Sequence, residues 1–175
     1  GYLAASPTGL AAALKGRQVA QEAGVALALT LSDVSMIQFC KGGLDAMLGD
    51  GVDYLFCNLE EAQVWCGTED LDAIRASLKK MAKMVCLTRG PEGSEILTAD
   101  ASCHVAAEKV KAIDTNGAGD MFAGAFLYAI TRGYSPEQSA SLGNHAAAAV
   151  VSQHGNRLTL GQLSAIKAYA LPPLK

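Results

Sequence analysis

A repeated alternation of helix-type and strand-type segments most strongly constrains the fold of this chain. Residues 7–24 carry apolar side chains at helical spacing and end at a glycine, and the apolar run VALALTL follows over residues 25–31. Alternation of this kind predicts parallel strands joined by crossover helices. The pattern continues with helices expected over residues 43–51, 59–67 and 71–83, and with strands expected over residues 53–58 and 84–88.

The order of expected helices and strands is different in the second half of the chain. Short strands are expected at residues 94–98, 101–105 and 110–113, and from residue 117 onward the sequence is mostly helical in pattern. No linker, internal repeat or low-complexity tract interrupts the chain. The sequence therefore predicts an α/β fold for the whole chain.

Composition narrows the classes of protein to consider. The chain has 175 residues, half of them apolar, which is enough to bury one sizeable core. A net charge of -3 gives no basic footprint for nucleic acid, and no apolar run is long enough to cross a bilayer. We therefore expect a cytoplasmic protein with neither nucleic acid nor membrane as a partner. Five cysteines without a CxxC pair favour buried thiols in a reducing compartment: Cys40, Cys57, Cys66, Cys86 and Cys103.

The densest group of chemically useful residues is DTNGAGD, residues 114–120. If this stretch is a turn that leads into a helix, Gly117 and Gly119 let a ligand approach the backbone, and the helix N-terminus favours an anion such as phosphate. Asp120 would repel a resting phosphate, so its presence calls for a purpose. Accepting a proton from a hydroxyl that attacks the phosphate is one such purpose.

A purely structural interpretation of the same turn stays open. In that interpretation Asn116 or Asp114 caps the helix, Asp120 complements the helix dipole and the glycines serve packing. Short glycine motifs often match by chance, so the local pattern alone does not decide between the two.

Three landmarks together resemble the ribokinase-like, or PfkB, family of carbohydrate and nucleoside kinases. They are NLEE at residues 58–61, LTRGPEGS at residues 87–94 and DTNGAGD at residues 114–120, in the family's order and approximate spacing. The resemblance implies a Rossmann-type three-layer α/β sandwich with a mostly parallel sheet. It also implies that residues 1–175 are the C-terminal nucleotide-binding and catalytic part of a single kinase domain. The first residue is Gly1, and the family's N-terminal half and lid are expected upstream.

The resemblance implies roles for the glycine turn. Asp120 would be the catalytic base, and the backbone N–H groups of Gly117, Ala118 and Gly119 would form the anion hole for the transferring phosphoryl group. Thr115, in the same motif, would contact the nucleotide. Asn58 and Glu61 would organise Mg²⁺ and phosphate through water. For this pair the alternative is an ordinary helix cap, in which Asn58 and Glu61 form a capping box.

Further nucleotide contacts follow from the family pattern. Thr88 and Gly90 would line the path of the triphosphate, and Gly93 would let backbone and ligand approach closely. Arg89 would touch phosphate or, equally well, be a solvated loop arginine. Farther along, Asn144 would border the adenine of ATP.

Cofactors and partners are also implied by the resemblance. ATP and Mg²⁺ are expected, together with a monovalent cation such as K⁺ near Asp114 and Asn116. Residues 27–62 look most similar to the adenosine kinase branch, which favours phosphorylation of a nucleoside hydroxyl, the adenosine 5′-OH first. The alternatives are a sugar kinase of the ribokinase or fructokinase kind and a catalytically silent nucleotide-binding module. A homodimer through the missing lid region is compatible with the same resemblance.

Overall fold

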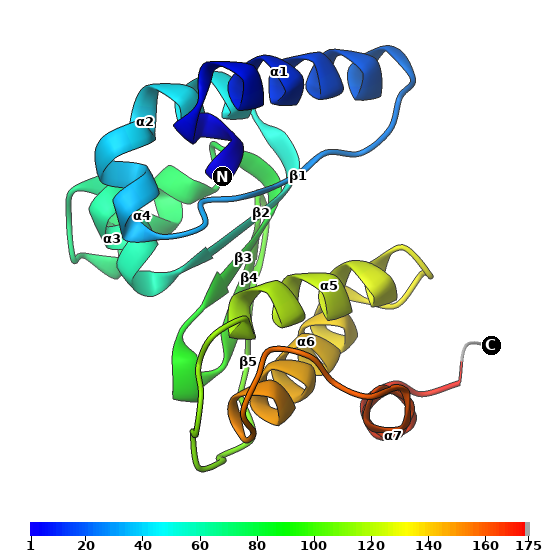
Figure 1. Cartoon of the computed structure of the whole chain (residues 1–175). Coiled ribbons are helices and arrows are strands. Elements are labelled where there is room, and N and C mark those ends of the chain that lie inside the picture. The colour runs from blue at the N-terminus through cyan, green and yellow to red at the C-terminus, as the bar shows by residue number, and fades with distance from the viewer. Residues whose placement is uncertain (174–175) are drawn as a thin grey trace. The chain divides into compact units, whose positions relative to one another are not determined.

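The computed structural model describes residues 1–173 as an α/β protein (Figure 1). Helices and strands alternate through the first half, and three helices follow the last strand, as the sequence predicts. In chain order the elements are a 3₁₀ turn Tyr2–Ala5, α1 Pro7–Glu22, β1 Ala28–Thr30, α2 Val34–Leu48, β2 Val52–Asn58, α3 Leu59–Cys66, α4 Leu71–Leu78, β3 Ala82–Thr88, a 3₁₀ turn Gly90–Glu92, β4 Ser94–Thr98, β5 Ser102–Val105, α5 Ala118–Ile130, α6 Pro136–Val151 and α7 Leu160–Ala170.

The five strands form one open, mostly parallel sheet in the order β1-β2-β3-β4-β5. β1 and β2 run parallel, with Ala28 opposite Tyr54 and Thr30 opposite Phe56. Parallel neighbours of this kind need a crossover connection, which α2 supplies between them. The fold class expected from the sequence is confirmed.

Two expected elements have wrong boundaries, and one expected strand is absent. α2 begins at residue 34 and not at 43, because the Asp33 side chain accepts a hydrogen bond from the backbone N–H of Met36 and caps the helix there. α4 ends at residue 78, and residues 82 and 83 belong to β3. Residues 110–113 form no strand; the backbone N–H of Ile113 donates instead to the carbonyl of Val151, 2.7 Å away, at the end of α6.

The chain divides into two compact units, and the first comprises Gly1–Leu87 with Leu97–Ser102. Its core is built from apolar residues of β1, β2, β3 and the helices between them, among them Leu44, Leu55 and Ile74, which are fully buried. Arg17 links α1 to the C-terminal end of α2 in this unit. Its guanidinium donates to the carbonyls of Leu48, at 2.8 Å, and Gly51, at 3.1 Å, so a cation sits at the negative end of α2.

The second unit comprises Thr88–Ile96 and the chain from Cys103 onward. α5 and α6 pack together in it, and the rings of Phe122 and Phe126 stack with their centroids 6.1 Å apart. Gly143 of α6 lies so close to Phe122 that a Cβ at this position would come within 2.7 Å of the ring. Ser135 and Gln138 form a capping box that begins α6.

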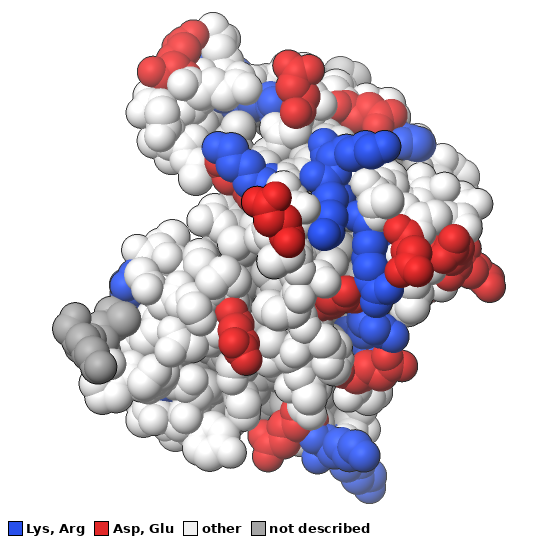
Figure 2. Space-filling model, turned by 180° about the vertical axis from the view of Figure 1, so that it is seen from behind, with Lys and Arg blue, Asp and Glu red and all other residues white. Residues whose placement is uncertain are grey.

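The surface charge and the burial of the cysteines can be compared with what the composition predicts. On the face shown in Figure 2, basic side chains form a short band that acidic side chains flank. Within residues 1–173 no cysteine forms a disulfide. The expectation of buried thiols is confirmed for Cys57 and Cys86, whereas Cys40, Cys66 and Cys103 are only half-buried. Within residues 1–173, no helix is both long enough and apolar enough to span a bilayer.

Candidate functional site

The DTNGAGD turn leads directly into α5, and its N-terminus carries no side-chain cap. Gly117 is the N-cap residue and has left-handed backbone angles, with φ 78° and ψ 3°. The Asp114 carboxylate accepts hydrogen bonds from the backbone N–H groups of Asn116, at 3.0 Å, and Gly155, at 3.4 Å. Asp114 therefore stabilises the turn and not the helix, and the expectation that Asp114 or Asn116 caps the helix is wrong.

The two glycines of the turn serve different needs. Gly117 has a positive φ, and a Cβ there would lie 2.6 Å from the Cβ of Asn156, so the fold itself requires a glycine. Gly119 has ordinary helical backbone angles, and a Cβ there would meet no atom within 4 Å. Packing among the described residues therefore gives no reason for Gly119 to be a glycine.

Asp120 lies in the first turn of α5 with its side chain exposed. Within residues 1–173 we find no hydrogen bond or ion pair to its carboxylate. Such a carboxylate is free to accept a proton or a hydrogen bond from a ligand. The first-turn N–H groups beside it have no partner within the helix, although the N–H of Ala118 makes a long 3.3 Å bond back to the carbonyl of Thr115.

A cavity of about 410 Å³ lies against this turn, entirely within the second unit. Most of the residues expected to contact the nucleotide line it together, although they come from three separate stretches of sequence. The predicted residues that line it are Thr88, Gly90, Gly93, Thr115, Ala118, Gly119 and Asn144. Gly117, Asp120 and Arg89 are not among the residues that line it.

The apolar part of this cavity comes from α5, α6 and the segment that follows β5. The sequence placed the base beside the small-residue helix that carries Asn144, whereas the contributions of α5 and of residues 107–112 to the apolar wall were not predicted. The additional lining residues are Pro91, Ala107, Glu108, Lys109, Val110, Ala112, Phe122, Ala147, Ala148 and Val151. Apolar walls with a few polar groups are typical of a site for a nucleobase or another small ligand.

Gly93 has no room for a side chain. Its φ is +98°, and a Cβ there would lie 2.1 Å from the carbonyl oxygen of Val105 and 2.6 Å from the backbone nitrogen of Ala107. The glycine therefore allows the end of β5 to pass directly over the turn before β4. The expected close approach of a ligand to the backbone at Gly93 remains a prediction.

Asn144 is buried in α6, with 5% of its surface exposed. Its side-chain Nδ2 donates to the carbonyl oxygens of Val105, at 2.8 Å, and Ala106, at 3.4 Å. The residue lines the cavity as expected, but its amide hydrogens point to backbone.

Arg89 is held by a neighbour. Its Nη2 lies 2.6 Å from Oε2 of Glu92, and 19% of its side chain is exposed. It is therefore not the solvated loop arginine of the alternative interpretation. A contact between Arg89 and phosphate remains a prediction, and it would have to compete with Glu92.

Asn58 and Glu61 belong to the first unit, where they form a complete capping box at the N-terminus of α3. The backbone N–H of Glu61 donates to Asn58 Oδ1 at 2.8 Å, and the backbone N–H of Asn58 donates to Glu61 Oε2 at 3.1 Å. Asn58 Nδ2 also donates to Glu61 Oε1 at 2.7 Å. Burial raises the pKa of the Glu61 carboxyl above its ordinary value, although the hydrogen bond from Asn58 opposes this shift. The structural alternative for this pair is confirmed, and a magnesium role remains a prediction.

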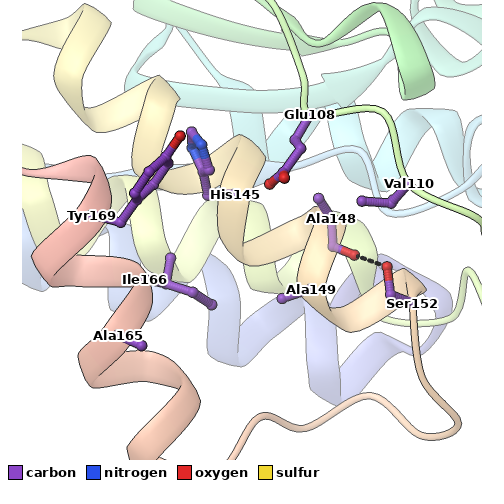
Figure 3. A pocket seen from close by; sticks show the side chains of 9 residues that line it. All are labelled: Glu108, Val110, His145, Ala148, Ala149, Ser152, Ala165, Ile166 and Tyr169. Atoms are coloured by element: carbon purple, nitrogen blue, oxygen red, sulfur yellow. Dashed lines mark hydrogen bonds between the residues drawn. The ribbon is translucent and has the colours of Figure 1, made fainter.

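A second cavity, of about 280 Å³, shares Glu108, Val110 and Ala148 with the first (Figure 3). His145 stands at one end, with its ring edge-on to Tyr169 of α7 at a centroid distance of 5.1 Å. The ring nitrogen Nδ1 of His145 lies 2.8 Å from the carbonyl of Ser141, so Nδ1 carries a hydrogen. The polar lining residues of this cavity are Glu108, His145, Ser152 and Tyr169, and the other five are apolar.

Within the described residues, no group of three or more His, Cys, Asp or Glu side chains could hold a metal ion. The magnesium role of Asn58 and Glu61 remains a prediction, for an ion that would keep most of its water ligands. Both oxygens of Glu61 already accept hydrogen bonds from Asn58, which suits contact through water better than direct coordination.

Comparisons with known proteins converge on one family. The family model of the pfkB family carbohydrate kinases matches residues 3–162. The crystal structure of adenosine kinase from Sinorhizobium meliloti superimposes with a TM-score of 0.85 at 31% identity, over 90% of this chain and 49% of that one. Phosphofructokinase-2 from Escherichia coli, solved with potassium, gives a TM-score of 0.74 at 24% identity, over 92% of this chain and 52% of that one, and shows the fold alone.

A curated relative also matches in sequence. The 5-dehydro-2-deoxygluconokinase of Listeria monocytogenes is 35% identical in an alignment 123 residues long that covers 62% of this chain and 38% of the relative. The chain thus spans about half of the similar solved structures and less of this relative.

Proposed function

Because the chain belongs to the pfkB family of carbohydrate kinases, we propose that it supplies the C-terminal nucleotide-binding and catalytic part of a single ATP-dependent kinase domain. The reaction is transfer of the γ-phosphoryl group to a hydroxyl of a small molecule. The observation that carries this proposal is the uncapped N-terminus of α5, with the free carboxylate of Asp120, beside a cavity that gathers the expected nucleotide residues.

In this proposal Asp120 accepts the proton of the attacking hydroxyl. Its exposed side chain is held by no described neighbour, so it is available to an acceptor that enters from solvent. The first-turn N–H groups of α5 and the positive end of its dipole stabilise charge that develops on the phosphoryl oxygens. Gly119 keeps that end of the helix open to the ligand.

ATP occupies the main cavity in this proposal, with its phosphates toward Gly119 and its base toward the apolar wall of α6. Mg²⁺, when bound, neutralises charge on the phosphates. Asn58 and Glu61 are the residues proposed to hold its water ligands. Asp114 and Asn116 are proposed to hold a monovalent cation; the negative charge of Asp114 supports this, because backbone hydrogen bonds from Asn116 and Gly155 lower the pKa of its carboxyl.

For the acceptor, we favour a nucleoside, with the 5′-OH of adenosine as the first candidate. The similarity of residues 27–62 to the adenosine kinase branch and the 31% identity to the adenosine kinase of S. meliloti support it. The second candidate is a sugar or sugar acid, which the sequence match to the Listeria kinase supports. A silent nucleotide-binding module is the third, and the presence of Asp120 argues against it.

A phosphorylation panel decides among these candidates. The protein, expressed with all the sequence that its gene supplies, is assayed with ATP and adenosine, inosine, ribose, fructose or 5-dehydro-2-deoxygluconate. Adenosine as the acceptor with the highest kcat/KM supports the first proposal, and a preferred sugar supports the second. ATP binding without turnover of any acceptor supports the silent module, and absence of ATP binding refutes all three.

A further inference from the structure

The side-chain NH₂ group of Asn144 is bonded to backbone. Both of its hydrogen-bond partners, the oxygens of Val105 and Ala106, are carbonyls, so the side-chain NH₂ must face them. The NH₂ group therefore faces backbone, and only the amide oxygen is left to face a ligand.

Residues 105 and 106, which Asn144 contacts, directly precede one wall of the main cavity. Residues 107–110 follow directly and line the main cavity, and Glu108 and Val110 also line the second cavity. Figure 3 shows Glu108 and Val110 beside α6, on the side of His145 and Ala148. The segment therefore separates the two cavities, and the position of its first residues sets the shape of both.

Gly93 packs against the backbone of the same residues, 105–107. The Cβ position of Gly93 falls on the backbone of Val105 and Ala107, so this backbone rests on the turn before β4 without a gap. Asn144 on α6 and Gly93 thus fix residues 105–107 between them. If the amide is lost, the carbonyls of Val105 and Ala106 lose a buried donor, and the segment has no other described side chain to restore it.

We propose that Asn144 is a positioning residue, which acts on the nucleotide by holding residues 105–107 and hence the wall at residues 107–110. In this role its NH₂ group makes no hydrogen bond to the base. This inference rests on the proposed function, because it assumes that the main cavity takes a nucleotide.

The test compares Asn144→Ala and Asn144→Asp with the wild-type protein, all expressed with the complete sequence of the gene. Asn144→Asp keeps the shape of the side chain but replaces the donor by an acceptor. Ser139→Ala is the control, because Ser139 is buried in the same helix, lines neither cavity, and has no hydrogen-bond partner for its hydroxyl within residues 1–173. Kd is measured for ATP and for GTP, and hydrogen exchange is followed by mass spectrometry in the absence of nucleotide.

We expect both Asn144 variants to bind ATP and GTP about tenfold more weakly, by the same factor for the two nucleotides, because the hydrogen bonds to Val105 and Ala106 are lost and the longer one contributes little. Amide exchange should accelerate at residues 106–112 and stay unchanged in α5. The control should match the wild-type protein in both measurements. Should Asn144→Ala fail to fold, Asn144→Asp carries the test, and Gly93→Ala, which displaces the same segment from the opposite side, should give the same exchange pattern.

Two results would overturn the inference. A loss of affinity for ATP much larger than for GTP would mean that Asn144 reads the base directly. Unchanged exchange at residues 106–112 would mean that the amide does not hold the segment. If the wild-type protein binds neither nucleotide, the proposed function fails, while the exchange measurement still decides whether Asn144 holds the backbone.

Discussion

The N-termini of α3 and α5 are two solutions to the same problem. A helix begins with N–H groups that have no partner inside the helix. At α3, Asn58 and Glu61 satisfy each other and the helix end through three hydrogen bonds. At α5, the N-cap is Gly117, which has no side chain to offer, and the acid of the first turn points to solvent.

This difference between the two helix ends indicates which of them is better suited to bind an anion. A closed helix end has little capacity left, whereas an open end with small residues presents free donors and a positive dipole end. α5 has the open end, and it lies against the cavity that Ala118 and Gly119 help to line. The acids of the two helix ends differ accordingly: Glu61 is a buried structural group, and Asp120 is an exposed carboxylate available for chemistry.

The largest effect is expected for Asp120→Asn, which removes the proposed base from the open helix end. Turnover should fall by about 100-fold or more, while ATP affinity and thermal stability stay close to those of the wild-type protein. The matched control is Glu137→Gln, since Glu137 is also an exposed acid in the first turn of a helix, α6. Equal activity of the two variants would show that position 120 contributes only its interaction with the helix dipole.

The next effect concerns the glycine that the fold itself requires. Gly117→Ala should lower the free energy of unfolding by about 1–3 kcal/mol, because alanine at a left-handed position is strained and its Cβ would press on Asn156. Urea unfolding measures this loss. Unchanged stability would mean that the turn can rearrange without cost, and the open helix end would then be less firmly built than the structure indicates.

Gly119→Val separates ligand access from folding. Its Cβ meets no atom within 4 Å, so stability should change by about 0.5 kcal/mol or less. The catalytic efficiency kcat/KM for ATP should nevertheless fall by about tenfold, because the side chain covers the donors of the helix end. Steady-state kinetics and thermal unfolding are measured on the same preparations. Kinetics equal to wild type would place the anion elsewhere.

The smallest effect concerns the capped N-terminus of α3 and is seen in how the free energy of unfolding depends on pH. Burial raises the folded-state pKa of Glu61, so the folded protein binds more protons than the unfolded chain between the ordinary and the raised pKa. This contribution makes stability fall as pH rises through that window. Glu61→Gln preserves a capping box but cannot titrate, so the fall should be smaller by about 1 kcal/mol or less.

Urea unfolding at a series of pH values from acid to neutral measures the slope. Glu60→Gln is the control, because Glu60 lies in the same turn with an exposed side chain. The account of Glu61 as a buried structural acid fails if the slope changes equally in both variants.

Much of the local structure could be predicted from the sequence. The caps of α3 and α6 are determined by side chains three residues apart, and the hydrophobic periodicity of α1 and of β2 identified these elements correctly. Residues 110–113 show the limit. Their apolar character resembles a strand, but Ile113 and Asp114 bond to the carbonyl of Val151, a partner nearly 40 positions away that no local pattern reveals.

The sequence by itself determined the family, the α/β class, the glycine turn and the acid at position 120, because each depends on residues that are neighbours in the chain. Only the tertiary structure decided that the fold requires a glycine at Gly117, whereas packing leaves space for a side chain at Gly119. It alone revealed that the amide of Asn144 holds the backbone of Val105 and Ala106, 39 and 38 positions earlier. The physical reason is that backbone angles and caps are local properties, whereas the space around a Cβ and the partner of a buried amide depend on segments that only folding brings together.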